Sequence, residues 1–196
     1  MTTVYFIRHA QSDPSHRDDR TRPLTEAGLR DTKLITACLG SRGISHILSS
    51  PYQRTLDTVA HLAETLALSV ETDEDFRERD AGGWHGDDFL DFVRAQWQDF
   101  EYRTENGESL AMVQKRNVAA LERALSKYRG QTIAVATHGT ALGTILNHYD
   151  PNWGIKSFLR ILNTMPYVIR LEIGDDGAKP RLSEILRVEK QWRKNG

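Results

Sequence analysis

Short hydrophobic runs in this chain end abruptly in polar residues. Residues 4–7 and 132–136 have the length and the β-branched or aromatic content typical of strands buried on both faces. Residues 46–49 form a third, shorter run. Segments with hydrophobic residues at helical spacing follow these runs. The alternation of strands and helices predicts an α/β fold with a mostly parallel central sheet.

Two of the predicted helices carry clear start signals. Thr25 is predicted as the N-cap of a helix that Gly40 closes. At residues 50–51, serine as N-cap and proline at the first helical position predict a second helix. Arg54 would then lie in the first turn, where a cation opposes the helix dipole unless an anion binds there. The alternative is an exposed arginine paired with Asp57 or another carboxylate.

The C-terminal third of the chain predicts antiparallel strands. Hydrophobic runs at 157–162 and 165–173 predict two strands, and a turn at 174–177 leads to a last strand at 181–188. These strands are expected to complete one side of the sheet. The short basic tail at 190–194 is interpreted as a solvated end.

A stretch rich in aromatic residues precedes the last predicted helix pair. Residues 87–102 have a weakly helical pattern, and a further helix follows 107–109. Packing is the favoured role of the aromatic side chains, and the segment 83–107 is also the best candidate for a short cap. The aromatic residues are Phe89, Phe92, Trp97, Phe100 and Tyr102.

Composition narrows the class of protein. The chain has 196 residues, a net charge of −1 and a single cysteine, Cys38. We therefore expect one domain over residues 1–196, without a disulfide framework or a multi-cysteine zinc site. Nothing indicates a nucleic-acid partner, a membrane span or a secretory signal. The expectation is a soluble, cytoplasmic protein.

Polar side chains with related chemistry follow three of the predicted strands. Arg8 and His9 follow the first strand, Arg54 the second, and His138 the strand at 132–136. Ligands of open α/β sheets bind at the carboxyl ends of strands, so these groups are expected in one crevice. Arginine binds phosphate oxygens bidentately, and nearby positive charge keeps a histidine neutral and nucleophilic. The pattern indicates phosphoryl transfer through His9.

A proton donor is needed because an alkoxide is a poor leaving group. Glu78 is the leading candidate in a segment rich in charge and glycine. Spacing alone leaves three rivals, which are Glu74, Asp75 and Asp80.

Other functional classes have weaker support. A metallohydrolase could use His9, His85 and His138 together with the acidic residues, but the two arginines would repel a cation. The segment 139–143 has alanine where an α/β-hydrolase elbow needs serine. A phosphate-dependent binding module could have dispensed with His9 or Glu78, and both are present.

Six segments in order resemble the motifs of one enzyme family. The chain is similar to the histidine phosphatase superfamily, the phosphoglycerate mutase-like enzymes, whose signature its Arg-His-Ala-Gln sequence resembles. The matching segments are residues 6–11, 24–28, 49–55, 76–79 with 83–86, 107–109 and 137–139.

The resemblance implies a phosphohistidine at His9 and a phosphate pocket formed by Arg8, Arg54 and His138. It implies Glu78 as the proton donor and no cofactor. It further implies a three-layer α/β/α sandwich.

Three features limit how much of the family's specificity transfers. Ala10 and Gln11 stand where the family usually has glycine and glutamate, and Ser15 lies near the position of an asparagine common in mutases. The cap at 83–107 is shorter than in the mutases, which favours a phosphatase over a mutase. The expected substrate is a small phosphate ester, with a phosphoprotein also open. The oligomeric state is not readable from the sequence.

Overall fold

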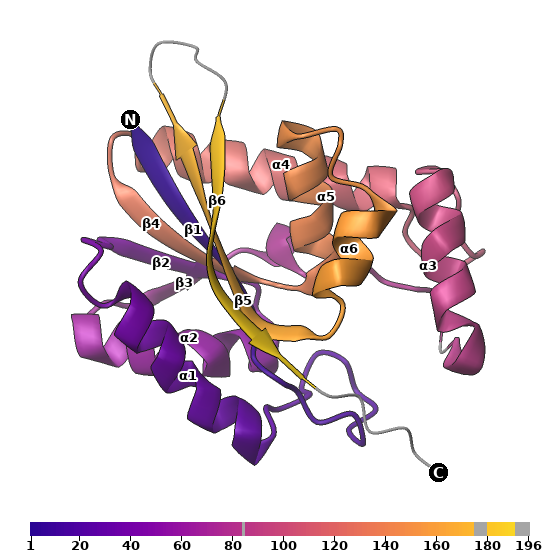
Figure 1. The fold of residues 1–196 in the computed structure, drawn as a ribbon, viewed down its shortest axis with the longest axis horizontal. Coiled ribbons are helices and arrows are strands. Elements are labelled where there is room, and N and C mark those ends of the chain that lie inside the picture. Colours follow the sequence, from indigo (N-terminus) through magenta and orange to yellow (C-terminus); the bar gives the residue numbers. More distant parts are fainter. Residues whose placement is uncertain (84, 175–179, 191–196) are drawn as a thin grey trace.

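A mixed β-sheet runs through the centre of the protein (Figure 1). The computed structural model describes residues 1–83, 85–174 and 180–190. In these residues the sheet has six strands in the order β3-β2-β4-β1-β5-β6. The strands are β1 (Thr2–Arg8), β2 (His46–Ser49), β3 (Val70–Thr72), β4 (Thr132–Thr137), β5 (Thr164–Ile173) and β6 (Arg181–Glu189).

Helices cover both faces of the sheet. Helices α1 and α2 lie on one face and α4 and α5 on the other (Figure 1), which confirms the predicted three-layer α/β/α sandwich. Within the described part of the chain the helices are α1 (Glu26–Leu39), α2 (Gln53–Leu66), α3 (Phe89–Gln98), α4 (Leu110–Lys127), α5 (Gly139–Tyr149) and α6 (Ile155–Ile161), with 3₁₀ turns η1 (Glu74–Phe76) and η2 (Gly86–Asp88).

Strand directions follow the predicted division. β1 pairs in parallel with β4, which pairs in parallel with β2, and β3 pairs in parallel with β2. On the other side of β1, β5 and β6 run antiparallel. The C-terminal strands are therefore the antiparallel part, as expected.

Successive side chains of β1 belong alternately to two hydrophobic clusters, one on each side of the sheet. Val4 and Phe6 belong to the cluster beneath α4 and α5, whereas Tyr5 and Ile7 belong to the cluster beneath α1 and α2. Successive side chains of a strand point to opposite faces, so a strand hydrophobic at every position must be covered on both. β1 is therefore a central strand, and its end lies within the body of the protein.

The helix-start predictions are confirmed for α1 and corrected for α2. The Thr25 side chain accepts a hydrogen bond from the Gly28 N–H, as an N-cap does. Helix α2, however, begins at Gln53 with Tyr52 as its N-cap. Ser50 precedes it by a turn in which its hydroxyl accepts from the Tyr52 N–H. Arg54 remains in the first turn of α2.

Two other predictions need correction. Residues 157–162 do not form a strand, because most of them belong to α6, where Phe158 and Ile161 are buried three positions apart at helical spacing. Strand β3 was not predicted, since its three residues are largely exposed and carry no hydrophobic run. The predicted turn at 174–177 and the tail at 190–194 lie almost wholly outside the described residues.

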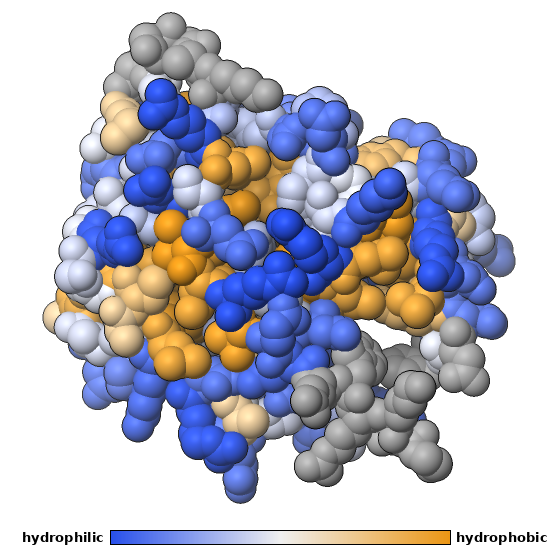
Figure 2. All heavy atoms as spheres, in the orientation of Figure 1, coloured by the Kyte–Doolittle hydropathy of each residue, from blue (hydrophilic) through white to orange (hydrophobic). Residues whose placement is uncertain are grey.

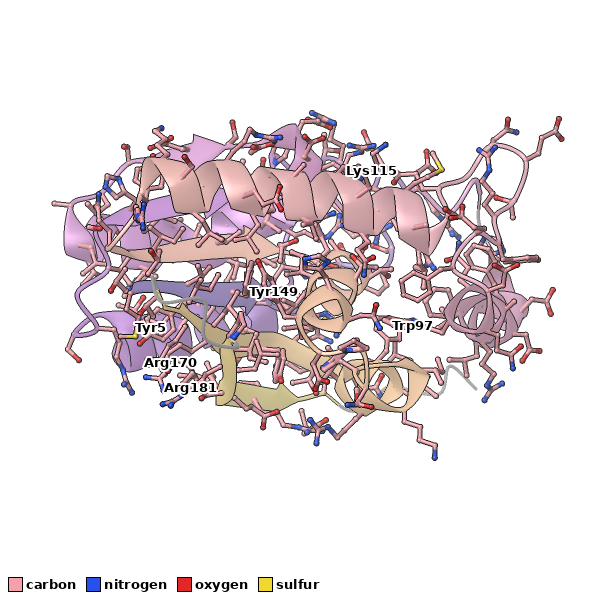
Figure 3. All side chains as sticks on the ribbon, turned by 90° about the horizontal axis from the view of Figure 1, so that it is seen from above. Tyr5, Trp97, Lys115, Tyr149, Arg170 and Arg181 are labelled. Carbon is pink, nitrogen blue, oxygen red and sulfur yellow. The ribbon has the colours of Figure 1, made fainter. Side chains whose placement is uncertain are left out.

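The aromatic side chains of α3 act mainly in packing, as favoured above. Seen from above, α3 lies at one end of the molecule with Trp97 on its inner side (Figure 3). The Trp97 ring lies 5.6 Å from the rings of both Trp153 and Phe158, measured between centroids.

Hydrophobic residues reach the surface between α6 and α3 (Figure 2). None of the described helices combines the length and hydrophobicity needed to span a bilayer.

Replacing Gly28 by alanine should destabilise the fold. An ideal Cβ at Gly28 would lie 2.2 Å from the backbone oxygen of Gln11, so either α1 or the segment after β1 must shift. We expect the free energy of unfolding to fall by about 1–3 kcal/mol. Urea denaturation measures this change. Gly154→Ala is the matched control, because nothing lies within 4 Å of its ideal Cβ; equal losses in the two variants would contradict the packing argument.

Candidate active site

The parallel pairing of β1 and β4 brings two histidines together. Arg8 is in register with Thr137, and the His9 N–H donates to the Thr137 carbonyl at 3.1 Å. His138 is the next residue after β4. The two imidazole rings consequently lie edge to face, with centroids 5.4 Å apart.

One hydrogen bond defines the tautomer of His9. Its Nδ1 lies 2.7 Å from the Ala10 carbonyl oxygen. A carbonyl can only accept, so Nδ1 carries the proton and Nε2 keeps its lone pair. The Ala10 N–H in turn donates to Thr58 Oγ1 at 2.9 Å, which holds the residue after the histidine against α2. The Nε2 lone pair of His9 is thus held in a fixed orientation.

Arg8 is buried beside the start of α5 and the end of α6. Its Nη1 donates to the Ile161 carbonyl at 2.5 Å, while its Nε is buried and has no hydrogen-bond partner among the described residues. An ideal Cβ at Gly139 would lie 3.1 Å from the guanidinium carbon, so a larger residue there would require Arg8 to shift by a few tenths of an ångström. Burial lowers the pKa of Arg8 to about 10, although Glu78 opposes that shift. The side chain remains a cation at neutral pH.

Arg54 is held by the loop that follows β1. Its Nη1 and Nη2 lie 3.2 and 3.3 Å from the two carboxylate oxygens of Asp19, and Nη1 also donates to the Asp19 carbonyl. The Arg54 side chain is only 3% exposed, whereas that of Asp19 is 47% exposed. The Tyr52 ring lies 5.1 Å from the guanidinium carbon. Of the alternative interpretation, the pairing with a carboxylate is present, but the partner is Asp19 and Arg54 is buried, whereas Asp57 accepts from Gln53.

His138 is fully buried behind these groups. Its Nε2 lies 2.8 Å from Ser50 Oγ, and its Nδ1 is buried with no hydrogen-bond partner in the part of the chain that the structure describes. The edge of its ring meets Tyr52 at 5.1 Å between centroids.

Both imidazoles are kept neutral by their surroundings. Burial, followed by the charges of Arg54 and Arg8, holds the pKa of His9 well below its ordinary value of 6.5. Burial and Arg54 lower the pKa of His138 in the same direction, with smaller contributions from His9. Desolvation and neighbouring cations both disfavour an imidazolium. The site therefore combines two cations, Arg8 and Arg54, with two neutral histidines.

The Glu78 carboxylate lies at the N-terminus of α5. It accepts from the Thr140 and Ala141 N–H groups, both at 3.1 Å, and from the Arg79 N–H at 2.8 Å. The Glu78 carbonyl accepts from Arg116 at 3.0 Å. These contacts hold Glu78 close to His138, which immediately precedes α5, and to Arg8.

The three rival carboxyl groups are engaged elsewhere. Glu74 forms a bidentate ion pair with Arg20, and Asp75 pairs with Arg123. Asp80 is exposed and accepts from the Gly82 N–H.

Four residues to which the sequence assigned no role in the site also support it. Asp19, Ser50 and Thr58 contact predicted site residues directly. Arg116 binds the carbonyls of residues 75, 77 and 78 as well as the Glu108 carboxylate. The motif at 107–109 was the available signal for Glu108, but nothing in the sequence pairs it with an arginine eight residues later.

The two family departures have defined structural places. Ala10 is completely buried, and Gln11 uses its carbonyl to accept from the Thr25 N–H at the start of α1. Ser15 donates to Asp13 on an exposed turn.

The third histidine of the alternative metal set lies elsewhere. His85 stacks on Phe92 and its Nε2 donates to the Ala81 carbonyl. Among the described residues, no group of three or more His, Cys, Asp or Glu side chains is arranged to hold a metal ion.

Comparison with known proteins finds one family. The model of the histidine phosphatase superfamily (branch 1) matches residues 4–185. A probable phosphoglycerate mutase GpmB of Yersinia pestis is 31% identical over 159 residues, which are 75% of this chain and 74% of that protein. A bifunctional protein of Mycobacterium tuberculosis is 32% identical over 157 residues, but these cover 74% of this chain and only 43% of that relative. The chain therefore spans less than half of the longer relative.

Solved structures share the fold at lower identity. YhfR of Bacillus stearothermophilus superposes with a TM-score of 0.79 at 23% identity, covering 94% of this chain and 96% of its own. A phosphoserine phosphatase variant of Entamoeba histolytica has a TM-score of 0.77 at 18% identity, covering 94% and 97%.

Asp19→Asn should strengthen the binding of inorganic phosphate. A phosphate oxygen at Arg54 would compete with the Asp19 carboxylate for the same two N–H groups. Because an ion pair with one half-exposed partner is worth about 0.2–1 kcal/mol, we expect a gain of about two- to fivefold in affinity. Isothermal titration calorimetry measures the gain. Asp18→Asn, in the same loop but bonded to the N–H groups of residues 20 and 21, should change nothing. Weaker binding by Asp19→Asn would mean that the carboxylate positions Arg54 instead.

Stability should fall as the pH drops below about 6.5. The pKa values of His9 and His138 are lowered in the folded state, so the unfolded chain takes up these protons first. The stability that the neutral histidines contribute is fully present above their pKa in the unfolded chain. It is lost as the pH falls toward their lower pKa values in the folded protein. Each histidine should cost up to about 1.4 kcal/mol per pH unit in that window. Urea denaturation at pH 7.5 and 5.0 tests this, and the double variant His9→Gln, His138→Gln should have a flatter dependence. Parallel curves would refute the assignment.

Proposed function

The chain belongs to the histidine phosphatase superfamily (branch 1), and we propose that it is a phosphatase that hydrolyses phosphate monoesters without a metal ion. Relatives in this superfamily include phosphatases and mutases, so phosphoryl-group chemistry is common to both possibilities. The finer assignment concerns the acceptor, which we propose to be water.

The observation that carries the proposal is the state of His9. Its Nδ1–H donates to the Ala10 carbonyl, so the lone pair of Nε2 is available for attack. Burial beside Arg54 and Arg8 lowers the pKa of His9, which keeps this nitrogen unprotonated at neutral pH. An uncharged imidazole between two guanidiniums suits a nucleophile for phosphorus.

In the first half-reaction, His9 Nε2 attacks phosphorus in line with the ester oxygen. The N–P bond forms as the P–O bond to the alcohol breaks, and Glu78 transfers its proton to the departing oxygen. Arg8, Arg54 and His138 stabilise the negative charge on the phosphoryl oxygens.

In the second half-reaction, a water molecule attacks the phosphohistidine. Glu78, now a carboxylate, takes a proton from the water as the new P–O bond forms and the N–P bond breaks. Inorganic phosphate leaves and His9 returns to its starting tautomer. His9 and Glu78 thus act in both half-reactions.

Glu78 is favoured over its three rivals by its contacts. Its carboxylate lies at the start of the helix that follows His138, and Arg116 binds its carbonyl. Glu74 and Asp75 are engaged with arginines, and Asp80 is exposed. Only Glu78 combines an attachment to α5 with proximity to Arg8.

Mutase-type phosphoryl transfer is the second candidate, because a relative at 31% identity is named as a probable phosphoglycerate mutase. The short segment at 83–107 favours the phosphatase, since a mutase must keep water from its phosphorylated intermediate. A phosphate-dependent binding module is the third and least supported possibility. We propose a small phosphate ester as the substrate, with a phosphoprotein as the alternative.

Hydrolysis of p-nitrophenyl phosphate in EDTA tests the proposal. Wild-type activity should persist in EDTA, and His9→Ala should lower kcat/KM by about 1,000-fold or more. Acid-quenched protein should carry phosphate on a histidine, and His9→Ala should not. Loss of activity in EDTA would refute the metal-free mechanism. A stable phosphohistidine that is discharged by a sugar acid but not by water would identify the mutase.

Glu78→Gln is the companion variant. This variant should lower kcat/KM by about 100-fold or more for an alkyl phosphate and by less for the nitrophenyl ester, whose leaving group needs less protonation. Asp80→Asn, two residues away and exposed, is the matched control. Equal losses on both substrates would exclude Glu78 as the acid.

A further inference from the structure

Ser50 is a buried hydroxyl in contact with a site histidine. It lies between β2 and α2, is completely buried, and its Oγ is 2.8 Å from His138 Nε2. Its backbone is fixed independently, since its N–H donates to the Ala136 carbonyl at 2.9 Å and its carbonyl accepts from Thr55 Oγ1 at 2.9 Å. The hydroxyl is therefore held at a set distance from the ring.

A neutral His138 can share a hydrogen bond with Ser50 in two ways. If the Ser50 hydroxyl donates to Nε2, the ring proton is on Nδ1. If Nε2–H donates instead, Nδ1 holds a lone pair and the hydroxyl proton needs another acceptor. Among the hydrogen bonds between described residues, the only other one to Ser50 Oγ comes from the Tyr52 N–H, which is a donor.

Counting unpartnered groups separates the two arrangements. With Ser50 as donor, only the Nδ1–H of His138 lacks a partner. With Ser50 as acceptor, both its own proton and the Nδ1 lone pair lack one. A buried polar group without a partner costs about 1–3 kcal/mol, so the first arrangement is favoured.

A phosphoryl oxygen can complete only the first arrangement. Such an oxygen accepts hydrogen bonds and does not donate, so it can bind an Nδ1–H but not an Nδ1 lone pair. Burial and the nearby arginines lower the pKa of His138, which means that the ring is not a donor at both nitrogens by protonation. The tautomer decides whether the ring can bind phosphate.

We propose that Ser50 is a positioning residue that sets the tautomer of His138, so that the neutral ring donates its Nδ1–H to the phosphoryl group. The inference rests on the proposed function for its phosphoryl ligand. At His9 the arrangement is the opposite, because its partner is a carbonyl, which can only accept and so leaves a lone pair on Nε2 for attack. A hydroxyl partner makes one histidine a hydrogen-bond donor, and a carbonyl partner makes the other a nucleophile.

Ser50→Ala, with Ser49→Ala as its matched control, tests the proposal. Ser49 is equally buried, but its hydroxyl donates to the Ser50 carbonyl and not to His138. Long-range ¹H–¹⁵N NMR of the full chain reports which nitrogen of His138 is protonated. Wild type and Ser49→Ala should be protonated at Nδ1, and Ser50→Ala should gain the Nε2–H form.

The kinetic readout is the hydrolysis of p-nitrophenyl phosphate. Loss of one hydrogen bond to the phosphoryl group in Ser50→Ala should lower kcat/KM by about 10- to 100-fold. The double variant Ser50→Ala, His138→Ala should be no worse than His138→Ala alone, because the two residues act as one unit. An Nε2–H tautomer in wild type, an unchanged tautomer in Ser50→Ala, or additive losses would overturn the proposal.

The two proposals fail in different ways. If the wild type neither hydrolyses the ester nor forms phosphohistidine, the proposed function is wrong, while the NMR result still decides the tautomer. If the wild type is active and the tautomer does not depend on Ser50, the function stands and the inference falls.

Discussion

The parallel register between β1 and β4 is the constraint on which the site depends. It sets Arg8 opposite Thr137 and leads both strands into a histidine at the same edge of the sheet. A shift of one residue would turn every side chain of β1 to the opposite face, which would exchange its two sets of core residues. Because both hydrophobic clusters draw on β1, the register that packs the core also pairs His9 with His138.

The two buried arginines of the site are partnered within the protein. Each buried arginine has an oxygen acceptor from the chain, the Ile161 carbonyl for Arg8 and Asp19 for Arg54. Burying an unpaired charge is costly, so these contacts make the arrangement tolerable before any phosphate binds. The acceptors are a neutral carbonyl and a half-exposed carboxylate, which a phosphoryl group with more negative charge can outcompete. His9 and His138 add no further positive charge to the site, because their lowered pKa values keep both rings neutral.

Scaffolding around the site is concentrated in a few polar side chains. Arg116 gathers three carbonyls of the segment that carries Glu78 and pairs with Glu108. Burial alone would raise the pKa of Glu108, but the hydrogen bonds from Arg116 and the Asp80 N–H outweigh it and the pKa is lowered. The bonds from Arg116 to these carbonyls, and those of the Glu108 carboxylate with Arg77 and the Asp80 N–H, tie the start of α4 to the segment between β3 and η2. The position of Glu78 thus depends on residues far away in the sequence. Arg77 binds Glu108, 31 positions later, and the Glu78 carbonyl accepts from Arg116, 38 positions later.

By itself, the sequence determined the elements with strong local patterns. The two-face-buried runs of β1 and β4, the Thr25 cap and the polar residues at the strand ends follow from periodicity and from side-chain chemistry, which act over a few residues. Where hydrophobic spacing was ambiguous, as in α6, or absent, as in β3, the prediction was wrong or missing. Only the tertiary structure decided that Ser50 meets His138 across 88 positions, and that Asp19 binds Arg54 across 35. Such contacts depend on strand register and on how loops close over helix ends, and no local pattern encodes either.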